Sequence, residues 1–267
     1  MPHNDSMFAP GDVWLVGAGP GDPELLTRKA ERLLREADVV FHDALVGHGV
    51  LDCVPPHVER VSVGKRSGRH SKDQGSINDL LLAAASAGRR VVRLKGGDPS
   101  IFGRSAEEIG HLARAGVIVR ICPGITAASA AAASAGVSLT LRGLARGMTL
   151  VTAHVRHGER LDLDWKALVG SSTTLGVYMG RSAAAEVSRS LIKAGMSPAM
   201  PVLVAVNVSL PRERLIHGTL SALPFLVKAI AEEEPTLLLI GEAVEPLDLS
   251  GSASQVGSGT PLCSATI

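Results

Sequence analysis

Five short segments of this sequence carry residue types that bind small ligands, and each follows an apolar run that predicts a strand. They are segments 17–22, 42–43, 64–70, 95–99 and 123–126. Ligands of α/β proteins bind beyond the carboxyl ends of the strands. We therefore expect these five segments to meet in one crevice.

The first segment contains Gly17, Gly19 and Gly21, and Asp43 follows about 20 residues later, as in a dinucleotide site. Two residues argue against that interpretation. Asp22 stands where the fingerprint has its third glycine and would place a carboxylate near the pyrophosphate, and Pro20 lacks an N–H that a phosphate would need. We predict a ligand without phosphate groups, and a purely structural turn stays the alternative.

Two of the other segments offer further ways to bind a ligand, one through closely approaching backbone and one through positive charge. Gly96 and Gly97 would let the main chain come close to a ligand, and Asp98 could accept hydrogen bonds from an ammonium or hydroxyl group, although an ordinary turn would look similar. Arginine forks bind carboxylates, so a basic group on this face predicts a polycarboxylate ligand, and a solvated charged loop is the alternative. The candidate basic residues are Lys65, Arg66, Arg69, His70, Lys72, Arg104, Arg142 and Arg146.

Composition excludes several classes of protein. The 267 residues carry a net charge of +1 and 3% aromatic residues, which argues against nucleic-acid binding. The cysteines Cys53, Cys122 and Cys263 fit neither a disulfide framework nor a zinc site, and His154 and His157 lack a further ligand, so we expect no metal. Without an apolar run of about 18 residues or an apolar signal core, we expect no membrane contact and a cytoplasmic location.

Apolar runs alternate with segments of helical period, which predicts an α/β protein. We expect two domains, 12–121 and 122–246, joined near Cys122–Pro123–Gly124 and each built on a mostly parallel sheet flanked by helices. Helices are expected from Asp22 to about Arg35, from Ser76, from Ser105 and over 125–135. The Ser/Gly-rich tail 247–267 is expected to be disordered. Strands are expected at 13–16, 37–41, 58–63, 90–94, 117–121, 148–152, 173–178, 201–206, 214–217 and 236–240.

Several motifs in this order resemble those of the uroporphyrinogen-III C-methyltransferases, a branch of the tetrapyrrole methylase superfamily. The similarity covers about 12–245, and the basic segment with its Gly-Lys-Arg is particular to this branch. The motifs are VGAGPGD (16–22), DVVFHDAL (38–45), VGKR (63–66), RLKGGDP (93–99), IFGR (101–104) and PGITAA (123–128).

The resemblance implies a homodimer with the active site in a cleft between two α/β domains. It implies S-adenosylmethionine as methyl donor, S-adenosylhomocysteine as product, and methylation of uroporphyrinogen III at C2 and C7. The product, precorrin-2, forms through precorrin-1 and leads to siroheme or cobalamin. Asp43 matches the family's proton acceptor, and Lys65 matches its proton donor or is a carboxylate clamp. The implied cofactor contacts are Pro20, Gly96, Gly97, Asp98, Ile101, Thr126, Ala127, Met179 and Val208.

The sequence departs from the family pattern at three positions. His42 replaces a tyrosine, Leu141 replaces a histidine, and Val208 replaces a glycine, which would add a side chain near the adenosine. Three alternative functions stay open: a methyltransferase acting on a later precorrin, a nucleotide-dependent oxidoreductase, and a binder of tetrapyrrole or nucleoside without enzyme activity.

Overall fold

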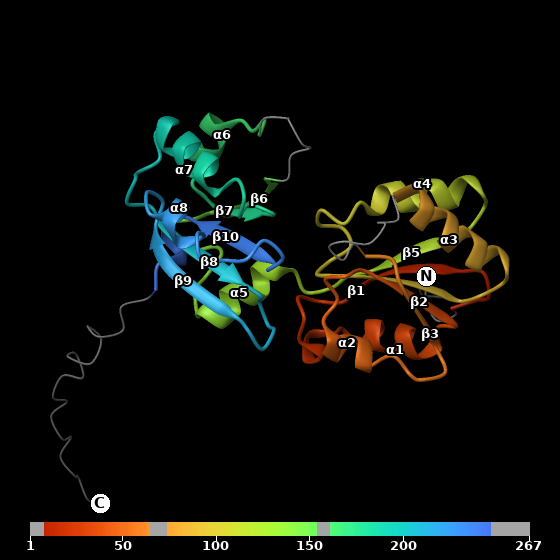
Figure 1. The fold of residues 1–267 in the computed structure, drawn as a ribbon. Helices are drawn as coiled ribbons and strands as arrows, with labels where there is room; N and C mark the ends of the chain where they lie inside the picture. The colour runs from red at the N-terminus through yellow and green to blue at the C-terminus, as the bar shows by residue number, and fades with distance from the viewer. Residues whose placement is uncertain (1–7, 65–73, 154–160, 247–267) are drawn as a thin grey trace, which may run out of the picture.

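The computed structural model describes residues 8–64, 74–153 and 161–246. Their strands form two five-stranded sheets that follow one another in the chain. In Figure 1 the first sheet and its helices lie on the right, the second on the left, and the chain crosses between them after β5. The α/β class is confirmed, and a strand lies at each of the ten expected positions.

The first sheet is parallel throughout, in the order β3-β2-β4-β1-β5. Its central strands are completely buried, in keeping with runs of Val and Leu that need apolar cover on both faces. Parallel pairing aligns all five carboxyl ends along one edge, where the predicted loops begin. The strands are β1 (Val13–Gly17), β2 (Val39–His42), β3 (Glu59–Ser62), β4 (Val91–Lys95) and β5 (Val119–Cys122).

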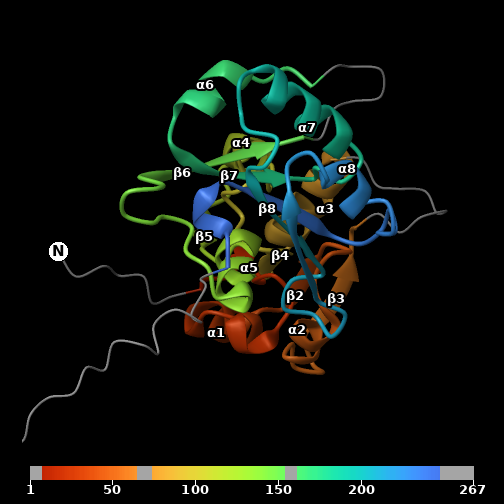
Figure 2. The same cartoon turned by 90° about the vertical axis from the view of Figure 1, so that its left-hand side faces the viewer.

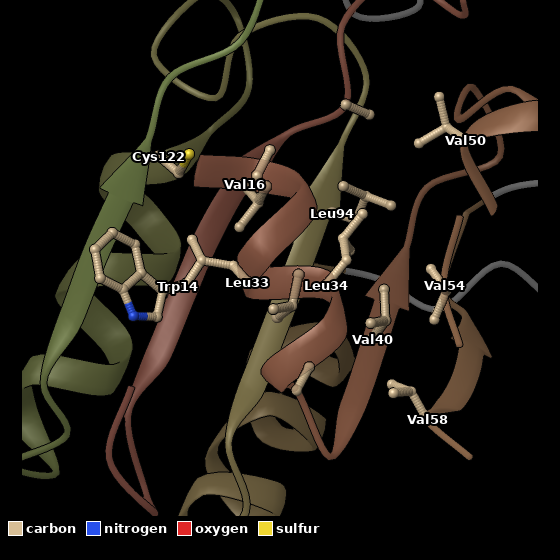
Figure 3. Packing of buried hydrophobic residues seen from close by; sticks show 14 of the residues in the cluster. Trp14, Val16, Leu33, Leu34, Val40, Val50, Val54, Val58, Leu94 and Cys122 are labelled. Carbon is tan, nitrogen blue, oxygen red and sulfur yellow. The ribbon is translucent and has the colours of Figure 1, made fainter. Parts of the chain in front are cut away.

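Helices cover both faces of this sheet. Helices α1 (Arg28–Glu36) and α2 (His48–Asp52) cover one face, where Leu33 and Leu34 pack against Trp14, Val16 and Val40 (Figure 3). Helices α3 (Gln74–Ser86) and α4 (Ser105–Arg114) cover the opposite face. Side chains alternate along a strand, so within β4 the arginine and lysine face the α3–α4 side together with Val91.

The second sheet has the order β6-β7-β10-β8-β9 and differs from the expected mostly parallel arrangement. The β6–β7 pair is parallel, whereas β7–β10, β10–β8 and β8–β9 are antiparallel. The short connection 207–213 between β8 and β9 has no room for a crossover helix and imposes antiparallel pairing. The strands are β6 (Gly147–Thr152), β7 (Thr173–Tyr178), β8 (Pro201–Val206), β9 (Arg214–Thr219) and β10 (Thr236–Ile240).

The second sheet is also covered on both faces. The alanine-rich α5 (Ala127–Ala135) packs on one face against side chains of β8 and β10. Helices α7 (Ala184–Lys193) and α8 (Leu223–Leu226) pack on the other face, together with partly buried residues of α6 (Trp165–Gly170). Figure 2 shows α5 below this sheet and α6 and α7 above it.

Two of the following three helix starts differ from the sequence expectation. Asp22 caps a 3-10 turn, Pro23–Leu25, and α1 starts later, with Thr27 Oγ1 accepting from the N–H of Ala30 at 3.0 Å. Helix α3 already starts at Gln74, so Ser76 lies inside it. Helix α4 starts at Ser105 as expected, although its N-cap is Arg104, in a left-handed conformation with φ 56°.

Candidate functional site

A cleft of about 1000 Å³ lies at the carboxyl ends of β1, β2 and β4, and residues that follow β7 and β8 also line it. All nine residues predicted for the cofactor line this cleft, although they are spread from position 20 to position 208. Asp43 and Arg104 line it as well. The expectation that these loops meet in one crevice is therefore met for the described segments, and residues 65–70 of the basic segment lie outside the described ranges.

Glycines allow three of these loops to touch through their backbones. Gly19 and Gly97 exchange two main-chain hydrogen bonds, of 3.2 and 2.7 Å. A Cβ atom built on Gly124 would lie 2.3 Å from the Gly97 carbonyl oxygen and 2.9 Å from the Gly17 Cα atom. Only glycine fits such close contacts, so these residues fix the loops after β1, β4 and β5 relative to one another.

Asp98 fastens two of the same loops. Its Oδ1 atom accepts from the N–H of Ser100 at 2.7 Å, and its Oδ2 atom accepts from the N–H of Gly124 at 3.0 Å. Gly97 has φ 67°, and a Cβ atom there would meet nothing within 4 Å, so its backbone borders open space. Asp98 thus shapes this part of the cleft, and each of its oxygens still has a lone pair for a ligand.

On the opposite side, Tyr178 at the end of β7 organises the start of α5. Its hydroxyl group pairs with the hydroxyl of Thr126 and accepts from the N–H of Ala128 at 3.2 Å. Thr126 makes no capping bond of its own, so Tyr178 satisfies a donor that the helix start leaves free. The Tyr178 ring also lies 5.1 Å from the ring of Phe102, which comes from the first sheet's loop after β4.

The connection between β8 and β9 reaches across to the glycine loop. Ser209 Oγ accepts from the N–H of Asp22 at 3.0 Å, and a Cβ atom on Gly21 would lie 2.4 Å from Leu210 Cδ2. Val208 is 6% exposed and packs in the core beneath α5, while its neighbours Asn207 and Ser209 have φ values of 52° and 60°. Val208 itself has no positive φ, so its backbone does not require the glycine of the family pattern.

The backbone is also left-handed at other places around the cleft. Phe102, Arg104 and Met179 line it with φ values of 52°, 56° and 54°. This conformation is uncommon outside glycine. Among the non-glycine residues with positive φ in the described ranges, Ser172 is the one that lies away from the cleft and its loops.

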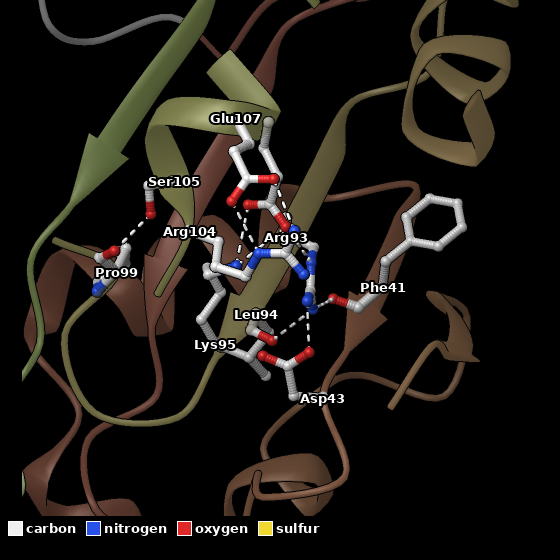
Figure 4. A network of polar contacts seen from close by, with 10 residues as sticks. Phe41, Asp43, Arg93, Leu94, Lys95, Pro99, Arg104, Ser105 and Glu107 are labelled. Carbon is white, nitrogen blue, oxygen red and sulfur yellow. Dashed lines mark hydrogen bonds and ion pairs between the residues drawn. The ribbon is translucent and has the colours of Figure 1, made fainter. Parts of the chain in front are cut away.

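A chain of ion pairs lies beneath Asp43. The guanidinium group of Arg93 donates to Asp43 through Nη2, to the carbonyl oxygens of Phe41 and Leu94 through Nη1, and to Glu108 through Nε at 3.2 Å. Figure 4 shows Asp43 and Lys95 on either side of the Arg93 side chain. Burial, followed by the nearby charge of Arg93, lowers the pKa of Lys95 below its usual value. This role of Arg93 was not predicted from the sequence, although a charged pair within a buried strand was the available signal.

Arg104 lies at the rim and is exposed. It binds Glu107 through Nε at 2.8 Å and Nη2 at 2.6 Å, and this pairing raises the pKa of its guanidinium group. On the other side of the cleft, Glu234 accepts from Asn207 Nδ2 at 2.9 Å and from Arg214 Nη2 at 2.6 Å. Hydrogen bonds, led by the one from the N–H of Ala231, lower the pKa of Glu234.

The remaining predicted residues fall into two groups. Arg142 and Arg146 do not line the cleft, because they precede β6 and lie at the opposite end of strands whose carboxyl ends reach it. The second group lies outside the described residues and consists of Lys65, Arg66, Arg69, His70, Lys72, His154, His157 and the tail 247–267.

Two further observations concern metal sites and membrane-spanning helices. Within residues 8–64, 74–153 and 161–246, no cluster of three or more His, Cys, Asp or Glu side chains is arranged to hold a metal ion. Over the same ranges, no helix combines the length and the apolarity that crossing a membrane would require.

Comparison with known proteins identifies the family. A model of the Tetrapyrrole (Corrin/Porphyrin) Methylases matches residues 12–224. The chain therefore belongs to the tetrapyrrole methylase family, as its motifs predicted.

Within this family, the chain is 48% identical over 231 residues to a uroporphyrinogen-III C-methyltransferase of Paracoccus denitrificans, covering 86% of this chain and 80% of that protein. It is 44% identical to a siroheme synthase of Gluconacetobacter diazotrophicus, where the match covers 91% of this chain and 53% of that longer protein.

Solved structures agree with this assignment. The uroporphyrin-III C-methyltransferase of Thermus thermophilus, crystallised with S-adenosylhomocysteine, superposes with a TM-score of 0.74 at 42% identity, covering 87% of this chain and 98% of that one. A cobalt precorrin-4 methyltransferase superposes with a TM-score of 0.79 at 29% identity, covering 88% and 97%.

Proposed function

We propose that this chain transfers methyl groups from S-adenosylmethionine to uroporphyrinogen III, at C2 and then C7, giving precorrin-2 through precorrin-1. The observation that carries the proposal is the convergence of the nine predicted cofactor residues and Asp43 on one cleft. The identity to uroporphyrinogen-III C-methyltransferases supports this substrate over later precorrins.

The cleft fits a cofactor without phosphate groups. Among the described cationic side chains in the lining, Arg93, Lys95 and Arg181 each lie within ion-pair distance of a carboxylate of this chain. Arg104 lies at the rim and binds Glu107 through Nε and Nη2. A phosphate-bearing ligand would need unengaged cations or the N–H groups of a glycine loop, and Pro20 provides no N–H. The open backbone at Gly97 gives the adenosine and methionine parts of the cofactor room to approach.

When bound, S-adenosylmethionine supplies an electrophilic methyl group, so the protein's main contribution is alignment. The glycine contacts and the Asp98 bonds hold the loops on one side, and Tyr178 holds the start of α5 on the other. We assign cofactor contacts to Pro20, Gly96, Gly97, Asp98, Ile101, Thr126, Ala127, Met179 and Val208.

Asp43 is the proposed proton acceptor. Methylation of a pyrrole carbon leaves a proton that the macrocycle must release, and a carboxylate can take it. The Asp43 side chain is 29% exposed, so one part of it reaches the cleft while Arg93 holds the other.

Substrate carboxylates require positive charge, which we assign to Arg104 and to the basic segment with Lys65, Arg66, Arg69 and His70. Val63 and Gly64 line the cleft, so the chain enters this segment from the cleft wall. Arg142 and Arg146 are not included, because they do not line the cleft. Four predictions complete the proposal. They are a domain division near residue 122, a homodimer, a cytoplasmic location and a place in siroheme or cobalamin synthesis.

A turnover assay tests the proposal. The protein, uroporphyrinogen III and methyl-labelled S-adenosylmethionine are incubated without oxygen, and the product mass is followed. We expect two methyl groups per tetrapyrrole, and Asp43→Asn should reduce turnover more than affinity for S-adenosylhomocysteine. Binding of both ligands without transfer would refute the enzyme assignment, and transfer to a later precorrin alone would refute the substrate.

A further inference from the structure

Glu108 on α4 is a buried carboxylate for which the proposed reaction has no assigned role. Its side chain is 0% exposed and lies between two cations of β4 that are nearly as buried, Arg93 at 3% and Lys95 at 5%. Buried carboxylates are rare unless they are paired. The surroundings of Glu108 therefore point to a specific use.

Glu108 contacts both of these cations. Both of its oxygens accept from Lys95 Nζ at 2.9 Å, and Oε1 also accepts from Arg93 Nε at 3.2 Å. Arg93 donates its remaining bonds to the carbonyl oxygens of Phe41 and Leu94 and to Asp43. All three guanidinium nitrogens of Arg93 are thus engaged. The hydrogen bond from Nε to Glu108 therefore helps to fix the orientation of the guanidinium group that binds Asp43.

Charge balance gives Glu108 a second effect. Among the described residues, Asp43, Arg93, Glu108 and Lys95 form one row of alternating charge, in which Glu108 binds Lys95 at 2.9 Å. Without Glu108, two buried cations would share one carboxylate, and Lys95 would compete with Arg93 for Asp43. A buried cation left without its partner is strongly unfavourable.

We propose that Glu108 is a positioning residue for the methyl transfer: it anchors Arg93 and retains Lys95, so that Asp43, held by Arg93 through one oxygen, faces the cleft as the proton acceptor. This inference rests on the proposed function, because it assigns Asp43 the role of acceptor. Glu108 itself touches neither substrate nor cofactor and acts through Arg93.

The test compares two variants with the wild type. Glu108→Gln keeps the shape of the side chain but leaves two cations beside one carboxylate, and we expect kcat to fall roughly ten- to hundredfold, as when an outer partner of an oriented group is lost. The dissociation constant of S-adenosylhomocysteine should stay within about twofold, since Glu108 itself does not line the cleft. In Glu108→Gln/Lys95→Met the cations and carboxylates balance again, and Gln Oε1 can accept from Arg93, so most of the lost kcat should return.

The matched control is Asp38→Asn. Asp38 accepts two bonds from the Arg90 side chain, at 3.1 and 2.7 Å, at the opposite end of the same two strands. This variant removes the carboxylate partner of Arg90, which lies three residues before Arg93 in the chain, and kcat should not change.

A second readout does not depend on turnover. Solvent exchange of the Arg93 Nε proton, followed by NMR with ¹⁵N-arginine, should be slow in the wild type, faster in Glu108→Gln and slow again in the double variant. If the wild type does not methylate uroporphyrinogen III, the proposed function fails, and this exchange rate still decides whether Glu108 anchors Arg93.

Three results would overturn the inference: an unchanged kcat in Glu108→Gln, a fall in kcat matched by an equal loss of S-adenosylhomocysteine affinity, or a double variant no more active than the single one. If Glu108→Gln does not fold, the charge-balanced double variant is measured alone. A kcat more than tenfold below the wild type would then count against the inference.

Discussion

Gly124→Ala is the substitution that most directly tests how the cleft is built. Gly124 follows β5 and touches the loops after β1 and β4 through its backbone. Its φ is not in the left-handed region, so alanine can adopt the same backbone conformation. The whole effect of the added methyl group must therefore come from its contacts.

The size of the effect follows from those contacts. The new Cβ atom would lie 2.3 Å from the Gly97 carbonyl oxygen, a backbone atom that cannot rotate away, and contacts below 3.0 Å are essentially never seen. The loops must separate by about 0.7 Å, close to the 1 Å misplacement that costs about a hundredfold in rate. Overpacking of about 2 kcal/mol should lower the melting temperature by roughly 4–8 °C.

Two measurements check this prediction. Calorimetric titration with S-adenosylhomocysteine should show affinity at least about tenfold weaker, and kcat should fall by one to two orders of magnitude. The control is Gly170→Ala at the end of α6, where an added Cβ atom meets nothing within 4 Å, and it should change neither quantity. Wild-type affinity and turnover in a folded Gly124→Ala protein would show that the cleft does not depend on contact between these loops.

Three further predictions concern stability and the two sides of the cleft. Val208→Gly should lower the free energy of unfolding by about 2–4 kcal/mol without strengthening S-adenosylhomocysteine binding, because Val208 packs in the core; tighter binding in calorimetry would contradict this. Leu210→Ala should weaken S-adenosylhomocysteine binding more than tenfold through loss of packing on Gly21, and unchanged affinity would contradict it. The hydrogen bond from the Arg90 side chain lowers the pKa of Asp38 to about 2, below its usual 3.8, so the stabilisation exists above pH 3.8 and is lost as the pH falls through 2. In urea unfolding, Asp38→Asn should be less stable than the wild type by at most about 1 kcal/mol at pH 7, and this difference should disappear as the pH falls below 2.

The strands and the ligand loops could be predicted from the sequence because their signals are local. Runs such as Val13–Gly17 must be buried, and the residues after them carried recognisable motifs. The pairing of the second sheet could not be predicted, since it depends on which strands meet rather than on where they lie. Arg142 and Arg146 were assigned to the substrate because of their charge. The charge of a residue does not indicate at which end of the sheet it lies.

The polar interior was also beyond sequence reasoning. Glu108 looks like any acidic residue in the first turn of a helix, and its partners lie 13 and 15 positions earlier in the chain. Leu210 packs against Gly21, although the two residues lie in loops that follow strands of different sheets. Such a contact produces no periodic pattern in the sequence. Such contacts require the packed structure.

The left-handed residues around the cleft affect how this protein could be stabilised in the laboratory. Outside glycine, such a conformation costs about 1–2 kcal/mol per residue. Glycine at Phe102, Arg104 or Met179 would relieve that strain, so a screen for heat resistance should recover glycine there. The same substitutions would remove an aromatic ring, a guanidinium group or a thioether from the cleft wall. Selection for thermal resistance and selection for turnover should therefore favour different residues at these positions.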